Sequence, residues 1–172
     1  MKTINSIFEI CGSDFMAYNP EGDWVGKYFD DVPNILILKE CAGVYVFTLC
    51  DEVVYVGSSI NLFNRFRTHV MNIQHGDNCL HSTPAERKYY YFNNHIKDIQ
   101  FKVIATYDKC ISKEELESYE NQYIDLYSPI FNINCGQKIN QWCGTEEDIE
   151  DFVLGLLTVD DLMRKMKSNT TK

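Results

Sequence analysis

Four side chains that can act on a phosphate group lie between residues 45 and 69 of this 172-residue chain. They are two phenols (Tyr45 and Tyr55), a guanidinium (Arg65) and an imidazole (His69). A guanidinium can bind two phosphate oxygens at once, and phenol and imidazole groups can hold or move protons. Together these groups suit an anionic phosphate better than they suit a hydrophobic core.

The two tyrosines lie in a run that is typical of a β-hairpin. Residues 43–57 read GVYVFTLCDEVVYVG, in which only Asp51 and Glu52 interrupt the β-branched and aromatic residues. We expect antiparallel strands over 43–48 and 52–57, joined by a turn at the two acids.

The segment after the hairpin has the period of an amphipathic helix. Its apolar residues recur on one stripe, which consists of Leu62, Phe66, Val70 and Ile73. Arg65 and His69 are four residues apart on a neighbouring face, so the helix brings their polar ends together, one turn apart.

Two elements are predicted next along the chain. Thr83 can cap a helix that has Pro84 in its first position and Glu86 completing a capping box, and this helix should run to about Lys97. Residues 99–107, IQFKVIATY, have the composition of a strand.

A capping box within residues 111–116 opens a further helix, which should end near Tyr127 because Pro129 cannot continue it. Residues 131–134 are expected to form a short strand. An acidic helix should begin at Thr145, with an apolar face made of Ile149, Phe152, Val153, Leu156 and Leu157.

These elements predict an α/β (α+β) fold, with a small, mostly antiparallel three-stranded sheet flanked by helices. We expect an N-terminal extension over residues 1–41, a central domain over 42–136 and an acidic helical extension over 137–172. Residues 1–40 mix aromatic residues with turn formers, and only 35–38 suggest a short strand or helix.

Composition excludes several classes of protein. An apolar content of 45% argues against disorder, and no apolar run approaches the roughly 20 residues of a membrane span. Residues 1–10 lack the apolar core of a secretory signal, so we expect an intracellular protein, cytoplasmic or nuclear. Seven cysteines without a CxxC pair indicate reduced thiols and neither a zinc finger nor a disulfide framework.

The net charge of −9 is unevenly distributed. Residues 58–110 carry seven lysines and arginines against four acids, whereas both flanking regions are acidic. A locally basic strip can bind phosphates while acidic flanks keep non-specific affinity for nucleic acid low.

From about Ala42 to Asn134 these motifs resemble the GIY-YIG nuclease family. Gly43-Val44-Tyr45 stands where the family has GIY, and Tyr55-Val56-Gly57 stands where it has YIG. The other pieces follow in the family's order: Arg65 and His69 at the spacing of the homing-endonuclease branch, Glu120 on an acidic helix, then Pro129 and Asn132. Each motif alone is common, so the resemblance rests on their combination.

The resemblance implies a metal-dependent endonuclease that hydrolyses DNA phosphodiester bonds. Glu120 would hold Mg²⁺ or Mn²⁺ together with waters and substrate oxygens, and Arg65 would clamp a non-bridging oxygen. Tyr45 is the expected general base, although a phenol of pKa about 10 needs nearby cations to favour its anion. Tyr55 would hydrogen-bond the water or the phosphate, and His69 would relay a proton or orient a tyrosine. The sequence leaves open which group is the base.

Other residues are expected to support the site or to bind nucleic acid. Gly43, Gly57 and Asn132 are candidate structural supports, since glycine lets the backbone approach closely and asparagine can tie strands together. Candidate phosphate contacts are Arg67, Arg87 and Lys88. In the aromatic run 89–92, some residues must be core, and Tyr89 or Tyr90 is a candidate to face the site or the DNA.

Taken singly, each of these residues also has a structural explanation. The alternative function is therefore a catalytically idle nucleic-acid-binding or protein-interaction module that keeps the nuclease fold. The acidic amphipathic region 146–167 could pack on the core or contact a protein partner, including a second copy of the chain. The resemblance also implies a mobile or viral genome, where compact nucleases of this type occur.

Overall fold

The computed structural model describes residues 7–12, 14, 35–79 and 84–132. Four strands form one sheet: β1 (Phe8–Cys11), β2 (Ala42–Leu49), β3 (Glu52–Ser59) and β4 (Ile99–Tyr107). Three α-helices are described, α2 (Leu62–Gln74), α3 (Pro84–Asn94) and α4 (Lys113–Tyr127), with short 3₁₀ helices η1 (Ile35–Leu38) and η2 (Gly76–Cys79). No helix in these ranges has the length and apolar character needed to cross a membrane.

The sheet is antiparallel throughout, with the strand order β1-β4-β2-β3. The three predicted strands are confirmed, but the expectation of a three-stranded sheet is wrong because β1 pairs with the outer edge of β4. The strand is only four residues long and its burial alternates between Phe8, Ile10 and their exposed neighbours. So short a segment, surrounded by turn formers, carries too weak a periodic signal to be distinguished from a loop.

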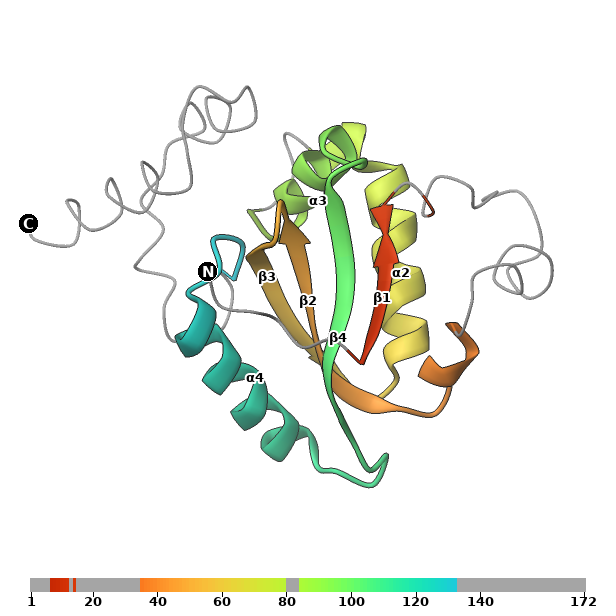
Figure 1. Ribbon diagram of the computed structural model, residues 1–172, viewed down its shortest axis with the longest axis vertical. Coiled ribbons are helices and arrows are strands. Elements are labelled where there is room, and N and C mark those ends of the chain that lie inside the picture. The colour runs from red at the N-terminus through yellow and green to blue at the C-terminus, as the bar shows by residue number, and fades with distance from the viewer. Residues whose placement is uncertain (1–6, 13, 15–34, 80–83, 133–172) are drawn as a thin grey trace, which may run out of the picture.

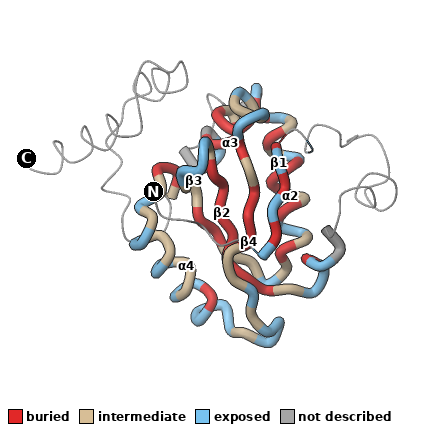
Figure 2. The backbone as a smooth tube through the Cα atoms, in the orientation of Figure 1, coloured by how far each residue is buried: buried red, intermediate tan, exposed pale blue. Residues whose placement is uncertain are grey.

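The sheet separates two layers of helix (Figure 1). One face packs on the predicted stripe of α2 and on α3, and its core includes Phe47, Phe66, Phe92 and Phe101. The other face packs on α4 through a smaller cluster of Val44, Val46, Val56 and Leu116. The central strand β2 is buried along almost its whole length (Figure 2).

The β2–β3 hairpin differs in detail from the predicted one. Its turn residues are Cys50 and Asp51, with φ of 48° and 66°, and Glu52 already belongs to β3. A two-residue turn with both φ angles positive matches the twist of the paired strands, so the turn lies one residue earlier than expected.

A bulge in β3 decides where Tyr55 points. Phe47 pairs with Tyr55 but Thr48 pairs with Val53, so Val54 is the extra residue. Val53 packs on the α4 side, whereas Val54 and Tyr55 both pack on the side of α2 and α3. The bulge therefore turns Tyr55 to the same face as Tyr45.

The helix ends follow local signals. Ser112 caps α4, as the capping box predicted, and Asn61 caps α2. Helix α4 ends at Tyr127, before Ser128, which has a left-handed φ of 49°. The predicted extension of the second helix to Lys97 is wrong, because α3 ends at Asn94 and the chain turns into β4.

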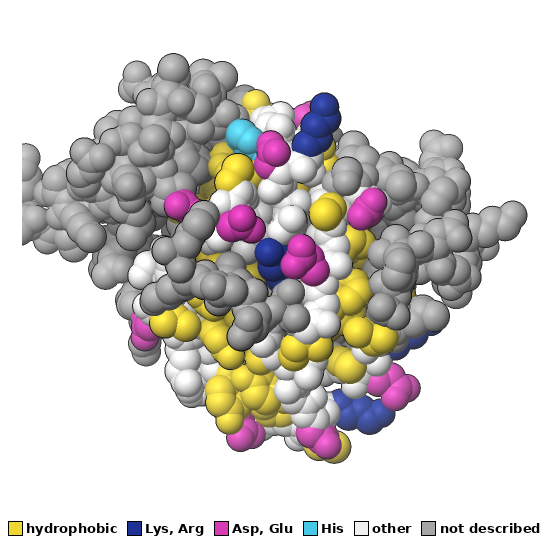
Figure 3. All heavy atoms as spheres, in the orientation of Figure 1, with side chains coloured by type: hydrophobic (Ala, Val, Ile, Leu, Met, Phe, Trp, Pro, Cys, Tyr) yellow, Lys and Arg dark blue, Asp and Glu magenta, His cyan; other side chains and the backbone are white. Residues whose placement is uncertain are grey.

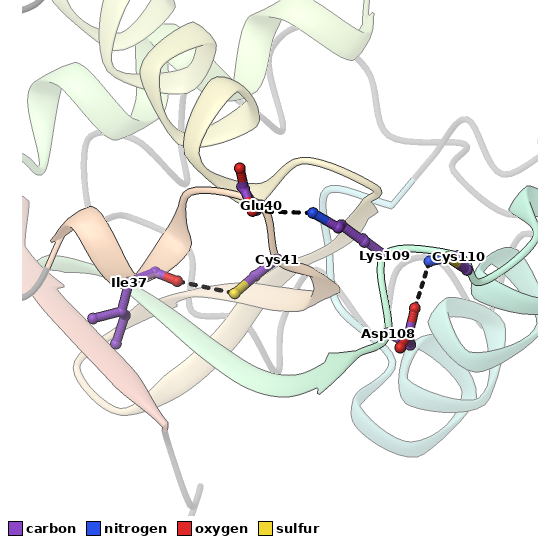
Figure 4. Close-up of polar contacts among 6 residues, drawn as sticks. All are labelled: Ile37, Glu40, Cys41, Asp108, Lys109 and Cys110. Carbon is purple, nitrogen blue, oxygen red and sulfur yellow. Dashed lines mark hydrogen bonds and ion pairs between the residues drawn. The ribbon is translucent and has the colours of Figure 1, made fainter.

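Polar contacts fix the loops at one end of the sheet (Figure 4). Lys109 forms an ion pair with Glu40, with 3.0 Å between Nζ and Oε2. The Asp108 carboxylate accepts a hydrogen bond of 2.8 Å from the backbone N–H of Cys110. This loop leads from β4 into α4, so it sets the start of the helix that carries Glu120. The predicted Thr83 cap and the predicted helix from Thr145 lie outside the described residues.

Candidate active site

Tyr45 and His69 are joined inside the core. Tyr45 extends from β2 and is fully buried, and its hydroxyl lies 2.7 Å from Nε2 of His69 on α2. On the other side of the imidazole, the hydroxyl of Tyr89 on α3 lies 3.0 Å from Nδ1. His69 is 1% exposed, so both ring nitrogens find their partners within the protein. The result is a buried hydrogen-bonded chain of three side chains, which are Tyr45 from β2, His69 from α2 and Tyr89 from α3.

Burial sets the proton affinities of these groups. It raises the pKa of the Tyr45 phenol well above its usual value, and the neighbouring Tyr55 adds to this rise. Burial also lowers the pKa of His69 well below its usual value, and the positive charges of Lys88 and Arg65 lower it further. At neutral pH the Tyr45 phenol is therefore protonated and the His69 imidazole is neutral.

Tyr55 and Lys88 lie beside this chain. The Tyr55 ring centroid is 6.2 Å from that of Tyr45. Burial, and then the negative charge of Glu120, raise the pKa of Tyr55. The Lys88 ammonium lies 4.8 Å from the centre of the Tyr55 ring and 4.7 Å from that of Tyr89, within the range of cation–π attraction. Lys88 thus brings a second cation to the phenols, in addition to Arg65.

Arg65 is an exposed residue of α2 whose charge acts on the buried groups. The pKa of its guanidinium is raised, chiefly by Tyr45, with Tyr55, Tyr89 and Glu120 contributing in the same direction. An exposed guanidinium beside buried phenols can reach a ligand from solvent, which suits the predicted clamp on a phosphate oxygen.

Glu120 reaches the same region from the opposite layer. It lies on α4 and accepts a short hydrogen bond from the hydroxyl of Ser58 on β3. Its charge acts on Tyr45, Tyr55 and Arg65, so the carboxylate belongs to the same electrostatic cluster. Since β3 is the edge strand, the site lies where the two helical layers meet around that edge.

The donor set fits a magnesium-like cation held by one carboxylate. Among the described residues, no three His, Cys, Asp or Glu side chains form a group that could hold a metal ion. A carboxylate offers about four lone-pair positions, of which Ser58 uses one. Mg²⁺ commonly binds proteins through one or two carboxylates and takes its other ligands from water and substrate phosphates.

Two of the predicted supporting residues, Gly57 and Asn132, adjoin this cluster, and the third, Gly43, packs elsewhere. A methyl group added to Gly57 would lie 2.5 Å from Cζ of Tyr45, so the phenol occupies the space that a side chain would fill. The Asn132 side chain accepts from Val56 N–H at 2.7 Å and donates to Val56 C=O at 2.6 Å. Gly43 lies against Ala105 and Leu62, where a methyl group would be 2.9 Å from Leu62 Cδ1.

The three candidate phosphate contacts, Arg67, Lys88 and Arg87, do not share one environment. Arg67 lies beside Phe63, with its guanidinium carbon 5.8 Å from the ring centre, two positions along α2 from Arg65. Lys88 is 7% exposed and belongs to the buried site, so it is not a surface contact. Arg87 lies in α3, but its side chain is outside the described structure.

One residue of the site, Ser58, was not identified from the sequence, Tyr89 was one of two candidates, and Lys88 was identified in another role. Ser58 directly follows the Tyr-Val-Gly motif, but a serine after a strand carries no distinctive signal. Tyr89 was one of two candidates within an aromatic run, and only the α3 packing selects it. Lys88 was expected on the surface because lysine is seldom buried.

The surface supplies little positive charge on the side seen in Figure 3. Acidic side chains are scattered over the described part of this face, and lysine and arginine side chains are few there. Of the two cations of the site, Arg65 is exposed on α2 and can meet a phosphate from solvent, whereas Lys88 is buried.

The fold is similar to solved structures of one bacterial domain, the N-terminal GIY-YIG endonuclease domain of UvrC from Thermotoga maritima. The structure bound to magnesium, its catalytic divalent cation, has 21% identity and a TM-score of 0.36, covering 57% of this chain and 90% of that chain. Two point mutants bound to the catalytic divalent cation have 20% and 21% identity and TM-scores of 0.37, each covering 58% of this chain and 91% of that chain.

A comparison with curated proteins gives no match. Residues 41–134, more than half of the chain, match the sequence profile of the GIY-YIG catalytic domain. This range spans β2 to the end of α4 and contains Tyr45, Tyr55, Arg65, His69 and Glu120. The protein therefore belongs to the GIY-YIG family.

Proposed function

We propose that the protein is an endonuclease that hydrolyses DNA phosphodiester bonds with the help of Mg²⁺ or Mn²⁺. One observation carries this proposal. Phenols, a guanidinium and an imidazole on one side of β3 share an electrostatic environment with a single carboxylate, Glu120, on the other side. This combination can bind a phosphate, hold a divalent cation and move a proton at one place.

Arg65 binds the substrate in this proposal. Its guanidinium pairs with a non-bridging phosphate oxygen and stabilises the charge that grows there as the phosphorus becomes pentacovalent. Tyr55, beside Arg65 and Lys88, donates a hydrogen bond to the phosphate or to the attacking water. Glu120 would hold the divalent cation, which would supply positive charge to the phosphate and lower the pKa of a nearby water.

Tyr45 and His69 manage the proton. A standing phenolate at Tyr45 is unfavourable because burial raises its pKa. The neutral His69, 2.7 Å away, can accept the Tyr45 proton while Tyr45 accepts one from water. Tyr45 then acts by passing a proton on and never holds a full negative charge in the dry interior.

The first experiment is cleavage of supercoiled plasmid by the purified protein with Mg²⁺, with Mn²⁺ and with EDTA. Nicked product is expected first, since one site cuts one strand. Glu120→Ala should reduce cleavage by at least about 100-fold because the metal ligand is lost. Glu117→Ala is the matched control, since Glu117 is exposed and paired within α4 to Lys113.

Two results would contradict parts of this proposal. Cleavage by a folded Glu120→Ala protein at the wild-type rate would remove Glu120 as the metal ligand. Wild-type protein that binds DNA but gives no metal-dependent product on linear, nicked, flapped or branched DNA would favour the idle binding module.

We also propose a biological setting. The spacing of Arg65 and His69 supports a place near the homing-endonuclease branch, and so a mobile or viral genome and an intracellular site of action. The acidic segment 146–167, which lies outside the described residues, is the proposed contact for a protein partner or a second copy.

A further inference from the structure

Helix α3 contributes Tyr89 to the proton chain. Its hydroxyl lies 3.0 Å from Nδ1 of His69, and its side chain is 6% exposed. The two rings are also in contact, with centroids 5.8 Å apart. A neutral imidazole has one N–H and one lone pair, so of the two tyrosine hydroxyls on its nitrogens, one must donate and the other must accept.

The two distances favour one assignment of the donors. A hydroxyl that donates commonly lies about 2.7 Å from its acceptor, and an N–H donor about 2.9–3.0 Å. The separation of 2.7 Å from Tyr45 to Nε2 fits donation by the Tyr45 hydroxyl. The separation of 3.0 Å between Nδ1 and Tyr89 fits donation by the ring N–H to the Tyr89 oxygen.

We infer that Tyr89 is a positioning residue that keeps the single proton of His69 on Nδ1, so that Tyr45 donates to Nε2 and keeps an oxygen lone pair for the proton that leaves the attacking water. This inference rests on the proposed nuclease function. It assigns to α3 a role in the reaction that is separate from packing.

Proton transfer accompanies the substitution at phosphorus. The water oxygen forms a bond to phosphorus, and the bond from phosphorus to the leaving oxygen breaks with its electron pair on that oxygen. The water proton moves to the Tyr45 oxygen as the Tyr45 proton moves to Nε2 of His69. The leaving oxygen takes a proton from solvent water and departs as a hydroxyl. His69 becomes an imidazolium whose Nδ1–H still donates to Tyr89, and after the product leaves it returns its extra proton through Tyr45 to solvent, so that the net reaction consumes one water.

The charges around His69 keep it ready for this step. Lys88 and Arg65 are the cations that act on the ring, and with burial they hold it neutral in the free protein. Tyr45, Tyr55 and Tyr89 surround it as uncharged rings. A bound phosphate brings negative charge next to the two cations, which favours the imidazolium when the proton arrives.

Nuclear magnetic resonance of the ¹⁵N-labelled, metal-free protein tests the inference without any cleavage assay. The His69 signals should show a protonated Nδ1 and an unprotonated Nε2 at pH 7.5. Tyr89→Phe removes only the hydroxyl, so the ring should lose this tautomer or mix it with the other one. Tyr90→Phe, which removes the hydroxyl of the half-buried neighbour, should leave the His69 signals unchanged.

Either of two spectra would overturn the inference. One is a wild-type His69 with its proton on Nε2, and the other is a Tyr89→Phe protein in which Nδ1 stays fully protonated. Because neither depends on cleavage, an inactive wild-type protein with the expected tautomer would reject the proposed nuclease function and not the role of Tyr89 in setting the tautomer.

Kinetics supply the second readout. Loss of the hydrogen-bond partner that orients a metal-ligating histidine typically costs about 10-fold to 100-fold in activity, and we expect a similar cost for a histidine that moves a proton. Tyr89→Phe should therefore lower kcat by about that factor with little change in KM, since it does not touch the phosphate. A Tyr89→Phe protein with wild-type kcat would overturn the inference as well.

Discussion

Gly57 and Tyr45 share one space in the molecule. The phenol of Tyr45 lies where a side chain at position 57 would stand, and a methyl group there would be 2.5 Å from Cζ and closer still to the hydroxyl. The phenol cannot move aside freely because it is fully buried and bonded to His69. Tyr45 can therefore occupy its position because Gly57 has no side chain.

Gly57→Ala should therefore damage the site more than the fold. The added methyl displaces the Tyr45 hydroxyl, and a misplacement of about 1 Å can cost about 100-fold in rate. Overpacking should lower the free energy of unfolding by about 1–3 kcal/mol. Plasmid cleavage and urea unfolding measure the two effects on the same preparation.

Gly12→Ala is the matched control for overpacking. A methyl group at position 12 would meet Ile96 and Ile99, away from the phenols. It should lower stability by a similar amount while folded protein cleaves at the wild-type rate. Wild-type cleavage by Gly57→Ala would show that the phenol does not need its present position.

The edge strand β3 is held by the chain that follows α4. Asn132 bonds both backbone groups of Val56, and the Phe131 N–H donates to the Val54 carbonyl at 2.9 Å. The predicted strand at 131–134 is not a regular strand in its described part, residues 131–132, yet it covers an edge that would otherwise be open to other chains. The contact also ties the end of α4 to the strand that carries Tyr55.

Asn132→Ala should lower the free energy of unfolding by about 1–3 kcal/mol. It leaves the N–H and C=O of Val56 without the side-chain amide in a partly buried place, which costs the desolvation of those groups. Urea unfolding followed by circular dichroism measures the loss.

Asn121→Ala provides the comparison, because Asn121 is exposed on α4 and alanine favours helix. It should change stability by less than about 0.5 kcal/mol. Equal stability of the two variants would mean that water replaces the Asn132 amide without loss.

The molecule buries two of its catalytic candidates, Tyr45 and His69, inside the packing that stabilises it. Tyr45 and His69 belong to the same face of the sheet as the largest aromatic cluster, and Phe47 stacks on Phe92 at 4.8 Å next to them. The site therefore cannot be protonated or repacked without affecting the global stability.

Stability should fall as the pH is lowered below about 6.5. The unfolded chain protonates His69 near that pH, whereas the folded protein resists because burial lowers the pKa of His69. The unfolded state then binds more protons, so stability is complete above the unfolded pKa and declines by up to about 1.4 kcal/mol per pH unit until the folded pKa is reached.

Urea unfolding between pH 7.5 and pH 5 measures this slope. His69→Gln should have a smaller slope whatever its stability at pH 7.5, and Asn121→Ala, an exposed substitution that removes no titratable group, should keep the wild-type slope. Identical slopes for all three proteins would contradict a neutral, buried His69.

Local signals were sufficient for most elements. The hairpin, the amphipathic stripe of α2 and the capping of α4 by Ser112 all depend on residues close in sequence, so their patterns are legible without the fold. The strand β1 and the end of α3 were predicted wrongly because they depend on distant partners. β1 exists through its pairing with β4, and Asn93 near the end of α3 donates to the Ile73 carbonyl in α2.

The sequence by itself determined the family, the order of the central elements and the residue types of the site, because motif spacing is a property of the chain. Only the tertiary structure decided that Tyr89 and Lys88 join the site and that Ser58 holds Glu120. The physical reason is that a β3 bulge and the packing of two helical layers bring these side chains together, and neither leaves a periodic trace in the sequence.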